Sequence, residues 1–249
     1  MTSDAFTDVS FLCCSYNQPT VLHRMLQSLV YHHPDVTFRA LIVENSDAGD
    51  IPGFLSRHGI PFWKNDTGDT RHSPSVDQGF ARIQTPWVLL CDTDIVIRRS
   101  LGGLLHMLLE TNVDVAGTLQ GDRGGYRLHP RISPHFCVVN LDRVRRHGIA
   151  FHDQARIDLT ASNGFFGHPP VQEQDGRRHY DCGGTFYEDC VGKALRIGAI
   201  DGLERYVFHA ESLSWADVAD PALGEHRRRR FMEESERYRD VDISGRFRP

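Results

Sequence analysis

The sequence predicts an α/β protein in which helices flank a mostly parallel central sheet and a helical extension follows at the C-terminus. Short apolar runs alternate with segments whose apolar residues recur at helical spacing over residues 8–120. The apolar runs are nearly continuous, as expected for strands that are buried on both faces. A composition of 40% hydrophobic and 24% charged residues is close to the average for globular proteins.

In the first half of the chain, strands are expected at the apolar runs and helices between them. The expected strands cover residues 9–14, 39–44, 60–63, 87–91 and 113–118. The expected helices cover residues 20–30, 51–58, 75–83 and 101–109. The first helix has the clearest boundaries, because Thr20 stands at a capping position and Pro34 lies just past its end.

In the second half the alternation loosens, and polar loops are expected at residues 121–134 and 163–178. The regular elements expected there are a strand at 136–140, helices at 141–147 and 187–197, and a strand at 206–209. The tail from Glu225 is rich in both arginine and acidic residues and predicts a charged surface helix. We therefore expect a single domain over residues 1–220, followed by a charged C-terminal helix or lid over residues 221–249.

Charge, apolar content and cysteine pattern narrow the class of protein. The chain has 28 Lys and Arg residues against 33 Asp and Glu residues, a net charge of −5, so no overall basic field favours nucleic acid. No apolar stretch reaches the roughly 20 residues of a membrane-spanning helix, and no signal peptide is visible. Six cysteines without a CxxC pair indicate free thiols in a reducing compartment. A soluble cytoplasmic protein is expected, with most histidines (His23, His32, His33 and His58 among them) on its surface.

Polar residues follow directly after three of the expected strands. Ser15 to Asn17 follow the first, Glu44 to Asp47 end the second, and Asp92-Thr93-Asp94 follow the strand at 87–91. In parallel sheets ligands bind beyond the carboxyl ends of the strands, so these residues are expected at one edge. Asp92 and Asp94 face the same way in an extended segment and can approach one divalent cation, such as Mg²⁺ or Mn²⁺.

Four motifs occur in an order that resembles GT-A glycosyltransferases, particularly the family 2 enzymes that use nucleotide-diphosphate sugars. They are Ser15-Tyr16-Asn17, Val43-Glu44-Asn45-Ser46-Asp47, Asp77-Gln78-Gly79 and Leu89-Leu90-Cys91-Asp92-Thr93-Asp94. Their spacing agrees with the family over roughly residues 8–120. The resemblance implies a GT-A, Rossmann-like fold, with the nucleotide-sugar half at residues 8–120 and the acceptor half at residues 121–220.

The resemblance also implies roles for individual residues in donor and metal binding. Glu44 replaces the usual Asp that contacts the base or ribose, and Asp77 stands where Asn is usual, although an ionised Asp only accepts hydrogen bonds. The implied donor-binding residues are Ser15, Tyr16, Asn17, Glu44, Arg71, Asp77, Asp92 and Thr93. The implied ligands of a Mn²⁺ or Mg²⁺ ion are Asp92, Asp94 and His209, a late histidine after an apolar stretch.

A catalytic base is expected near the start of a helix in the second half, commonly within a Glu-Asp pair. The candidates are Asp189, its neighbour Glu188, and Asp181, with Asp189 slightly preferred. In an inverting transferase such a base removes the proton of the acceptor hydroxyl as it attacks the anomeric carbon. An inverting mechanism is predicted, while a retaining mechanism, which would not need this base, stays open because the DxD motif does not determine the stereochemistry.

The predicted activity is metal-dependent transfer of a hexosyl group from a nucleotide-diphosphate sugar, a UDP-sugar by preference, to a hydroxyl acceptor of unknown identity. A nucleotidyltransferase is disfavoured because Ser15 to Thr20 lack a Gly-rich phosphate loop. Two alternatives stay open: a non-catalytic sugar-nucleotide or glycan-binding module, and a glycosyltransferase that modifies nucleic-acid bases. The second would use Arg227 to Arg230, although these residues also suit solvated pairing with Glu233, Glu234 and Glu236.

Overall fold

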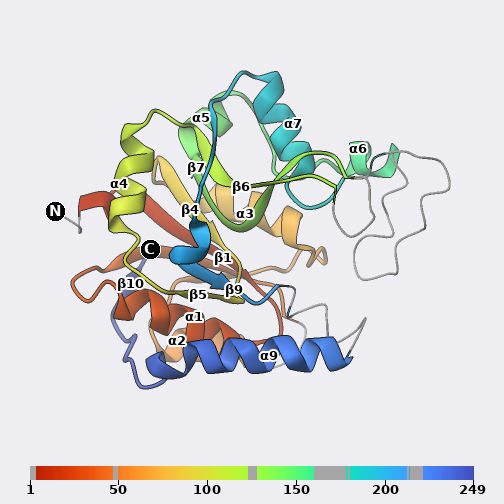
Figure 1. Ribbon diagram of the computed structural model, residues 1–249. Helices are drawn as coiled ribbons and strands as arrows, with labels where there is room; N and C mark the ends of the chain where they lie inside the picture. The colour runs from red at the N-terminus through yellow and green to blue at the C-terminus, as the bar shows by residue number, and fades with distance from the viewer. Residues whose placement is uncertain are drawn as a thin grey trace.

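The structure of the protein is a computed structural model, and it describes residues 4–46, 50–122, 128–159, 178, 180–211, 213 and 221–249 (Figure 1). Its strands are β1 Val9–Ser15, β2 Phe38–Glu44, β3 Phe62–Lys64, β4 Trp87–Cys91, β5 Ile95–Ile97, β6 Val115–Gln120, β7 Arg131–Asn140, β8 Ile197–Ala199, β9 Val207–His209 and β10 Phe247–Arg248. Its α-helices are α1 Pro19–Tyr31, α2 Ile51–Arg57, α3 His72–Arg82, α4 Gly102–Glu110, α5 Leu141–Arg146, α6 Gln154–Leu159, α7 Gly184–Gly192 and α9 Pro221–Ser235.

The main sheet runs in the order β10-β2-β1-β4-β7-β6-β8. Strand β3 also pairs with β2, farther along the strand than β10: β10 pairs with the start of β2 and β3 pairs with its end. Its pairings are parallel except where β7 runs antiparallel to β4 and to β6. A separate antiparallel pair joins β5 to β9. The predicted class, a mostly parallel central sheet flanked by helices, is therefore confirmed.

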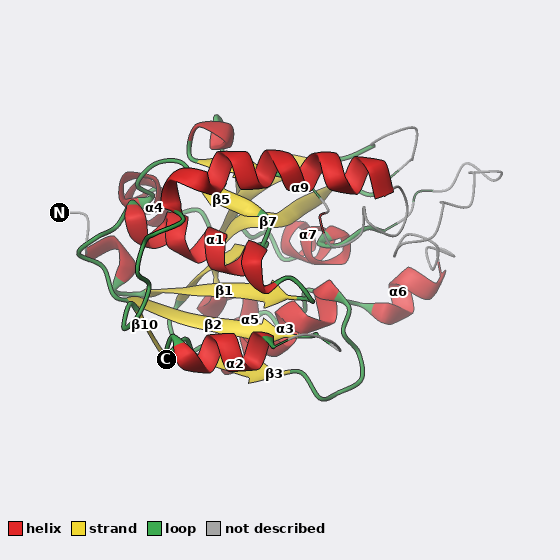
Figure 2. Cartoon of the chain, turned by 90° about the horizontal axis from the view of Figure 1, so that it is seen from below, coloured by secondary structure: helices red, strands yellow, loops and turns green. Residues whose placement is uncertain are grey.

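Successive side chains of the strands enter two different cores. Phe11 and Cys13 of β1 pack with α1, α2 and α4, whereas Leu12 and Cys14 pack on the opposite face with α3, α5 and α7. Figures 1 and 2 show these helices on the two sides of the sheet. Burial of both faces explains why the strands are continuously apolar rather than alternating.

The expected helix at residues 187–197 is wrong in its second half. Helix α7 begins earlier, at Gly184, and ends at Gly192; the chain then turns through Ala194, which has a φ of 53°, and enters β8. Strand β8 pairs in parallel with β6 at the far edge of the sheet. Three residues of strand, Ile197–Ala199, are too few to show a period-2 pattern in the sequence.

The C-terminal segment forms the expected helix and then returns to the main sheet. Helix α9 runs beside α1 (Figures 1 and 2), and Glu234 pairs with Arg98 at 2.8 Å. After α9, the side-chain amide of Gln27 in α1 donates to the carbonyl oxygens of Arg239 at 2.6 Å and Val241 at 3.0 Å. Strand β10 then pairs in parallel with the start of β2. The boundary between residues 220 and 221 stays a prediction.

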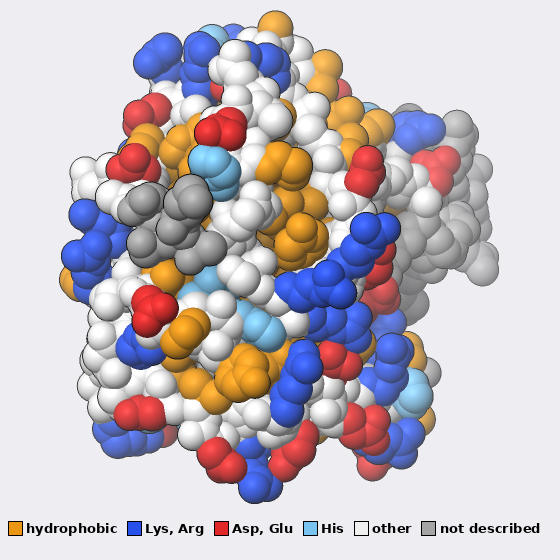
Figure 3. Space-filling view, turned by 60° about the vertical axis from the view of Figure 1, so that its left-hand side comes forward, with side chains coloured by type: hydrophobic (Ala, Val, Ile, Leu, Met, Phe, Trp, Pro, Cys, Tyr) orange, Lys and Arg blue, Asp and Glu red, His pale blue; other side chains and the backbone are white. Residues whose placement is uncertain are grey.

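The surface carries both signs of charge, and no described helix is long and apolar enough to cross a membrane. Acidic and basic side chains alternate along the lower rim in Figure 3. Within and beside α9, Arg227 lies 3.6 Å from Glu211, and Arg230 lies over the ring of Phe208. These contacts agree with the expectation of a charged surface helix.

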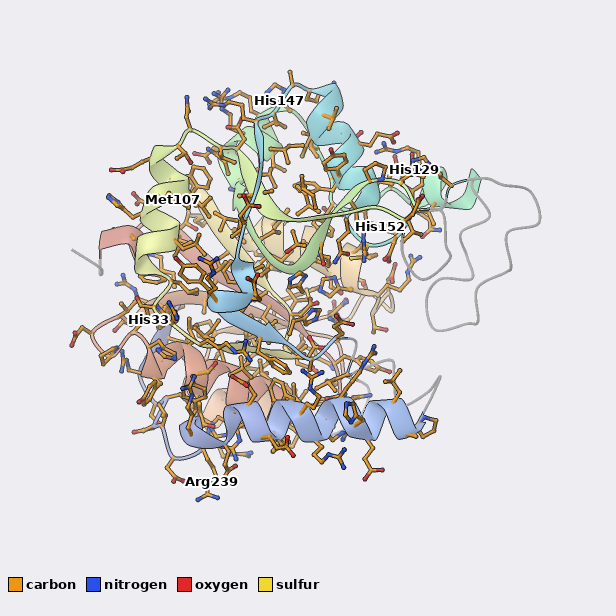
Figure 4. The ribbon with its side chains drawn as sticks, viewed as in Figure 1. His33, Met107, His129, His147, His152 and Arg239 are labelled. Atoms are coloured by element: carbon orange, nitrogen blue, oxygen red, sulfur yellow. The ribbon has the colours of Figure 1, made fainter. Side chains whose placement is uncertain are left out.

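The expectation that His33 lies on the surface is wrong. This side chain is only 3% exposed and stands at the end of α1 (Figure 4). Its Nδ1 lies 2.7 Å from the Leu29 carbonyl, and its Nε2 accepts the N–H of Leu101 at 2.8 Å. The ring is therefore a neutral, fully bonded connector between α1 and α4, and burial lowers its pKa.

Candidate active site at the carboxyl ends of the strands

The topology brings together the polar residues that follow β1, β2 and β4. These strands are adjacent and parallel, with Ser15 opposite Glu44 and Cys13 opposite Cys91 in the register. Their carboxyl ends therefore meet at one edge, where Asp92 emerges beside the end of β1. The convergence expected from the sequence is present in the structure.

Asp92, Asp94 and His209 form a compact cluster whose possible ligand atoms all lie within 4.8 Å of one another. The β5–β9 pair places His209 opposite Ile95 and hence beside the two acids. His209 Nε2 lies 3.3 Å from Asp94 Oδ1 and 4.0 Å from Asp92 Oδ2. Asp94 is buried, and its Oδ2 accepts the N–H of Leu213 at 3.0 Å.

The cluster has the chemistry of a site for a divalent cation. Two carboxylates and one imidazole suit Mn²⁺ and similar borderline metals. His209 Nε2 is buried and makes no geometrically sound hydrogen bond among the described residues, although it faces two carboxylates. Burial opposes ionisation of Asp92, yet contact with His72 and the charges of His209 and His135 outweigh it and lower its pKa to about 2. An ionised carboxylate is the form that binds metal.

Two histidines beside the cluster were not predicted from the sequence. His135 on β7 stacks on His209, with ring centroids 4.5 Å apart and planes within 4°. Its Nδ1 lies 2.6 Å from Ser133 Oγ, and burial together with the charge of His209 lowers its pKa to about 4. His72 at the start of α3 places Nε2 3.1 Å from Asp92 Oδ1. Neither has a local sequence signal, because both contacts are made across the fold.

Ser15, Asn17 and Glu44 lie together at the same edge of the sheet as this cluster. The backbone N–H of Asn17 donates to Ser46 Oγ at 2.8 Å, and Asn17 has a φ of 50°. Glu44 is fully buried, with Oε1 accepting the Ser46 N–H at 2.6 Å and Oε2 lying 2.7 Å from Lys64 Nζ. The buried Ser15 Oγ has no hydrogen-bond partner among the described residues. Tyr16 between them is half-buried, and Thr93 is buried.

Arg71 and Asp77 make contacts within the protein itself. Arg71 Nη2 lies 2.6 Å from Asp69 Oδ2, and its Nη1 donates to Gln154 Oε1 in α6. Asp77 accepts the backbone N–H groups of Phe151 at 2.6 Å and His152 at 2.9 Å, in the region where Figure 4 labels His152. Asp77 thus fixes the chain that leads into α6, a role in which two acceptor oxygens serve better than an amide.

Asp77 should make the stability of the protein depend on pH. Burial raises its pKa to about 6, although the Phe151 and His152 N–H groups oppose this. Because the pKa of Asp77 is higher in the folded state than in the unfolded state, protonated Asp77 adds to the free energy of unfolding. This contribution is complete below about pH 4 and is lost as the pH rises through 6. In Asp77→Asn this dependence should vanish. The stability advantage of wild type over the variant should therefore shrink by about 2 to 3 kcal/mol from pH 4.5 to pH 7.5. Urea unfolding of both proteins at several pH values measures this difference. Parallel plots of unfolding free energy against pH for wild type and Asp77→Asn would contradict the raised pKa of Asp77.

The three candidate bases lie on or just before α7, and each has a basic partner. Arg156 of α6 reaches both members of the Glu-Asp pair, at 3.0 Å from Glu188 Oε2 and 2.6 Å from Asp189 Oδ2. Asp181 instead pairs with Arg131, and both of those side chains are almost fully buried. The Asp181 carboxylate is thus less accessible to solvent than that of Asp189, which remains about one-third exposed.

Gly183 determines where α7 begins. Its φ is 83°, and a Cβ at this position would lie 2.3 Å from the carbonyl oxygen of Ile132 in β7. Only glycine tolerates both the left-handed backbone and this close approach. The turn directs α7 against β7 and sets Cys182, the residue before it, 3.3 Å from His72 through Sγ and Nδ1.

The fold is similar to those of solved glycosyltransferases. TarS 1–349 from S. aureus has a TM-score of 0.55 at 14% identity, covering 85% of this chain and 63% of that one. The galactosyltransferase LgtC, in complex with donor and acceptor sugar analogues, has a TM-score of 0.50 at 13% identity. This match covers 92% of this chain and 95% of LgtC. The glycosyltransferase GlyE from Streptococcus pneumoniae TIGR4 has a TM-score of 0.51 at 12% identity. This match covers 87% of this chain and 50% of GlyE.

These similarities establish the class of fold: the chain has the GT-A fold of nucleotide-sugar glycosyltransferases. It spans 63% of TarS 1–349 and 44% of a longer TarS structure, so it corresponds to part of those proteins. No protein-family model matches the sequence, and no curated protein sequence matches it either.

Proposed function

We propose that this chain is a metal-dependent glycosyltransferase of the family 2 type, which moves a hexosyl group from a nucleotide-diphosphate sugar to a hydroxyl acceptor with inversion. The observation that carries the proposal is the Asp92, Asp94 and His209 cluster at the carboxyl edge of a GT-A sheet. A UDP-sugar is the preferred donor. In support, a TarS 1–349 structure with a TM-score of 0.54 contains UDP.

In this proposal the two halves of the chain divide the work. Ser15 and Asn17 bind the nucleoside beside the cluster, and the fully buried Glu44 acts behind them by holding Ser46 and Lys64 in place. Asp92, Asp94 and His209 hold Mn²⁺ or Mg²⁺, which would neutralise the departing diphosphate. Residues 121–220 recognise the acceptor. Within the charged segment 221–249 the lid would be the start of α9, because the end of α9, the turn after it and β10 are held by Arg98, Gln27 and β2.

The proposed base is Asp189 in α7. Removal of the acceptor proton requires a carboxylate that is ionised and reachable from solvent. Asp189 is about one-third exposed, whereas Asp181 is buried against Arg131. A 2.6 Å contact with Arg156 holds the Asp189 carboxylate in a fixed orientation. The conformation of Asp189 is thereby set before the acceptor arrives.

A donor screen tests the proposal without knowledge of the acceptor. The protein is incubated with UDP- and GDP-sugars and Mn²⁺, and the release of free nucleotide diphosphate is measured. We expect slow hydrolysis of at least one donor, which EDTA abolishes and Mn²⁺ restores. Donor binding without turnover across a broad acceptor panel would favour a non-catalytic binding module instead. Neither binding nor release with any donor would refute the proposal.

A further inference from the structure

Three side chains from α3 and the turn before α7 form a connected series that ends on Asp92. Ser73 Oγ donates to Cys182 Sγ at 2.9 Å, and Cys182 Sγ lies 3.3 Å from His72 Nδ1. His72 Nε2 lies 3.1 Å from Asp92 Oδ1. His72 and Cys182 are 110 positions apart in the sequence, so this contact depends on the complete fold. His209 is not part of this series, because it faces the other carboxylate oxygen of Asp92, Oδ2.

The chemistry of the series fixes how the His72 ring is oriented. A carboxylate oxygen only accepts, so the ring nitrogen that faces Asp92 carries a proton. The other nitrogen faces the sulfur, which receives the Ser73 hydroxyl proton and can offer its own to Nδ1. Nε2 makes a close ion-pair contact with Asp92 Oδ1 whose geometry is not that of a sound hydrogen bond. The ring is thus held at Nδ1 by the thiol and faces one oxygen of Asp92, while the other oxygen faces His209.

The position of Cys182 is itself rigid. Its N–H donates to Asp181 Oδ1 at 2.7 Å, and its carbonyl accepts from Arg131 Nη1 at 3.2 Å. Gly183, the next residue, is confined by its left-handed backbone and by the Ile132 carbonyl. The sulfur therefore serves as a fixed support for the imidazole, whereas a solvent-exposed thiol would move between rotamers.

We propose that His72 is a positioning residue for Asp92, and that Cys182 and Ser73 hold its ring in place. This inference rests on the proposed function, because it assigns to Asp92 the role of a metal ligand. Hydrogen-bond partners that orient a ligating side chain commonly change metal affinity by 10- to 100-fold when they are removed. In this chain the thiol comes from the turn before α7, so the acceptor half would help to set the geometry of the metal site.

The test is the dissociation constant for Mn²⁺, measured by titration calorimetry or by electron paramagnetic resonance of free Mn²⁺, with and without UDP. We expect His72→Ala to weaken Mn²⁺ binding by about 10- to 100-fold. His72→Gln should recover most of the affinity, because its amide N–H reaches the place of Nε2. Cys182→Ala should weaken binding by about 3- to 10-fold, whereas Cys182→Ser, which keeps a donor, should stay close to wild type.

The matched control is Cys190→Ala, which removes a thiol from the buried face of α7. It should lower the unfolding temperature without changing Mn²⁺ affinity. Wild-type affinity in His72→Ala or in Cys182→Ala would overturn the inference, as would equal weakening in His72→Ala and His72→Gln. Failure of the proposed function looks different, because then wild type itself binds no Mn²⁺ and the inference falls with it.

Discussion

Asp94→Asn should reduce metal-dependent turnover of the nucleotide-sugar donor by about 1,000-fold or more. The buried carboxylate uses Oδ2 to accept the Leu213 N–H and presents Oδ1 to His209 at 3.3 Å. Asparagine has the same shape as aspartate, and its side-chain oxygen can still accept the Leu213 N–H. Its NH₂ group, however, then stands where the cation requires an oxygen. The measurements are nucleotide-diphosphate release and Mn²⁺ affinity, both of which should fall while the unfolding transition remains cooperative.

A second buried carboxylate provides the control for Asp94. Asp114 is also 5% exposed, and its Oδ2 accepts the Arg196 N–H at 2.9 Å beside β6. Asp114→Asn should therefore cost stability in the same way but leave Mn²⁺ affinity and turnover near wild type. If Asp94→Asn kept turnover within about tenfold of wild type, the assignment of the cluster as the metal site would be wrong.

Asp189→Asn should lower transfer to the acceptor by about 100- to 10,000-fold, the contribution expected of a general base. Asparagine cannot take up the proton of the acceptor hydroxyl. Asp189 is about one-third exposed and is not a member of the Asp92, Asp94 and His209 cluster. The affinities for Mn²⁺ and UDP and the midpoint of urea unfolding should therefore change little. Steady-state transfer rates, together with calorimetry on the same samples, separate a loss of transfer from a loss of Mn²⁺ or UDP binding.

Two neighbouring acids test that assignment. Glu188→Gln changes the other member of the pair, which accepts the Tyr180 hydroxyl at 2.5 Å, and should retain transfer. Asp181→Asn breaks a buried ion pair with Arg131 and should instead destabilise the protein by about 3 to 5 kcal/mol. Loss of transfer in Glu188→Gln, with normal transfer in Asp189→Asn, would move the role of the base to Glu188.

The part of the site that the sequence predicts is the part encoded locally. An apolar run that ends abruptly in Ser15, Glu44 or Asp92 already shows where a buried strand meets solvent, and parallel pairing then brings these ends together. His72, His135 and Cys182 have no such signal. Their positions depend on how α3, β7 and α7 pack, and a single sequence does not specify that packing.

The fold shows the same division between local and distant information. The central strands and most helices follow from periodicity, whereas β8 and β10 are too short to carry a pattern. Both are held by their partners: β8 by β6 and β10 by β2. Their conformation comes from hydrogen bonds supplied by distant residues, which outweigh local preference in such short segments.

The pairing of β10 with β2 has a consequence for synthesis of the protein. On the edge of β2 that faces away from β1, Phe38 and Arg39 pair with Phe247 and Arg248, which come much later in the sequence. As the chain leaves the ribosome, that section of the sheet edge keeps unpaired N–H and C=O groups until residues 247 and 248 emerge. Open edges of this kind invite pairing with other chains. A nascent polypeptide that stalls before residue 247 thus exposes a stretch of sheet edge that β10 covers in the folded protein.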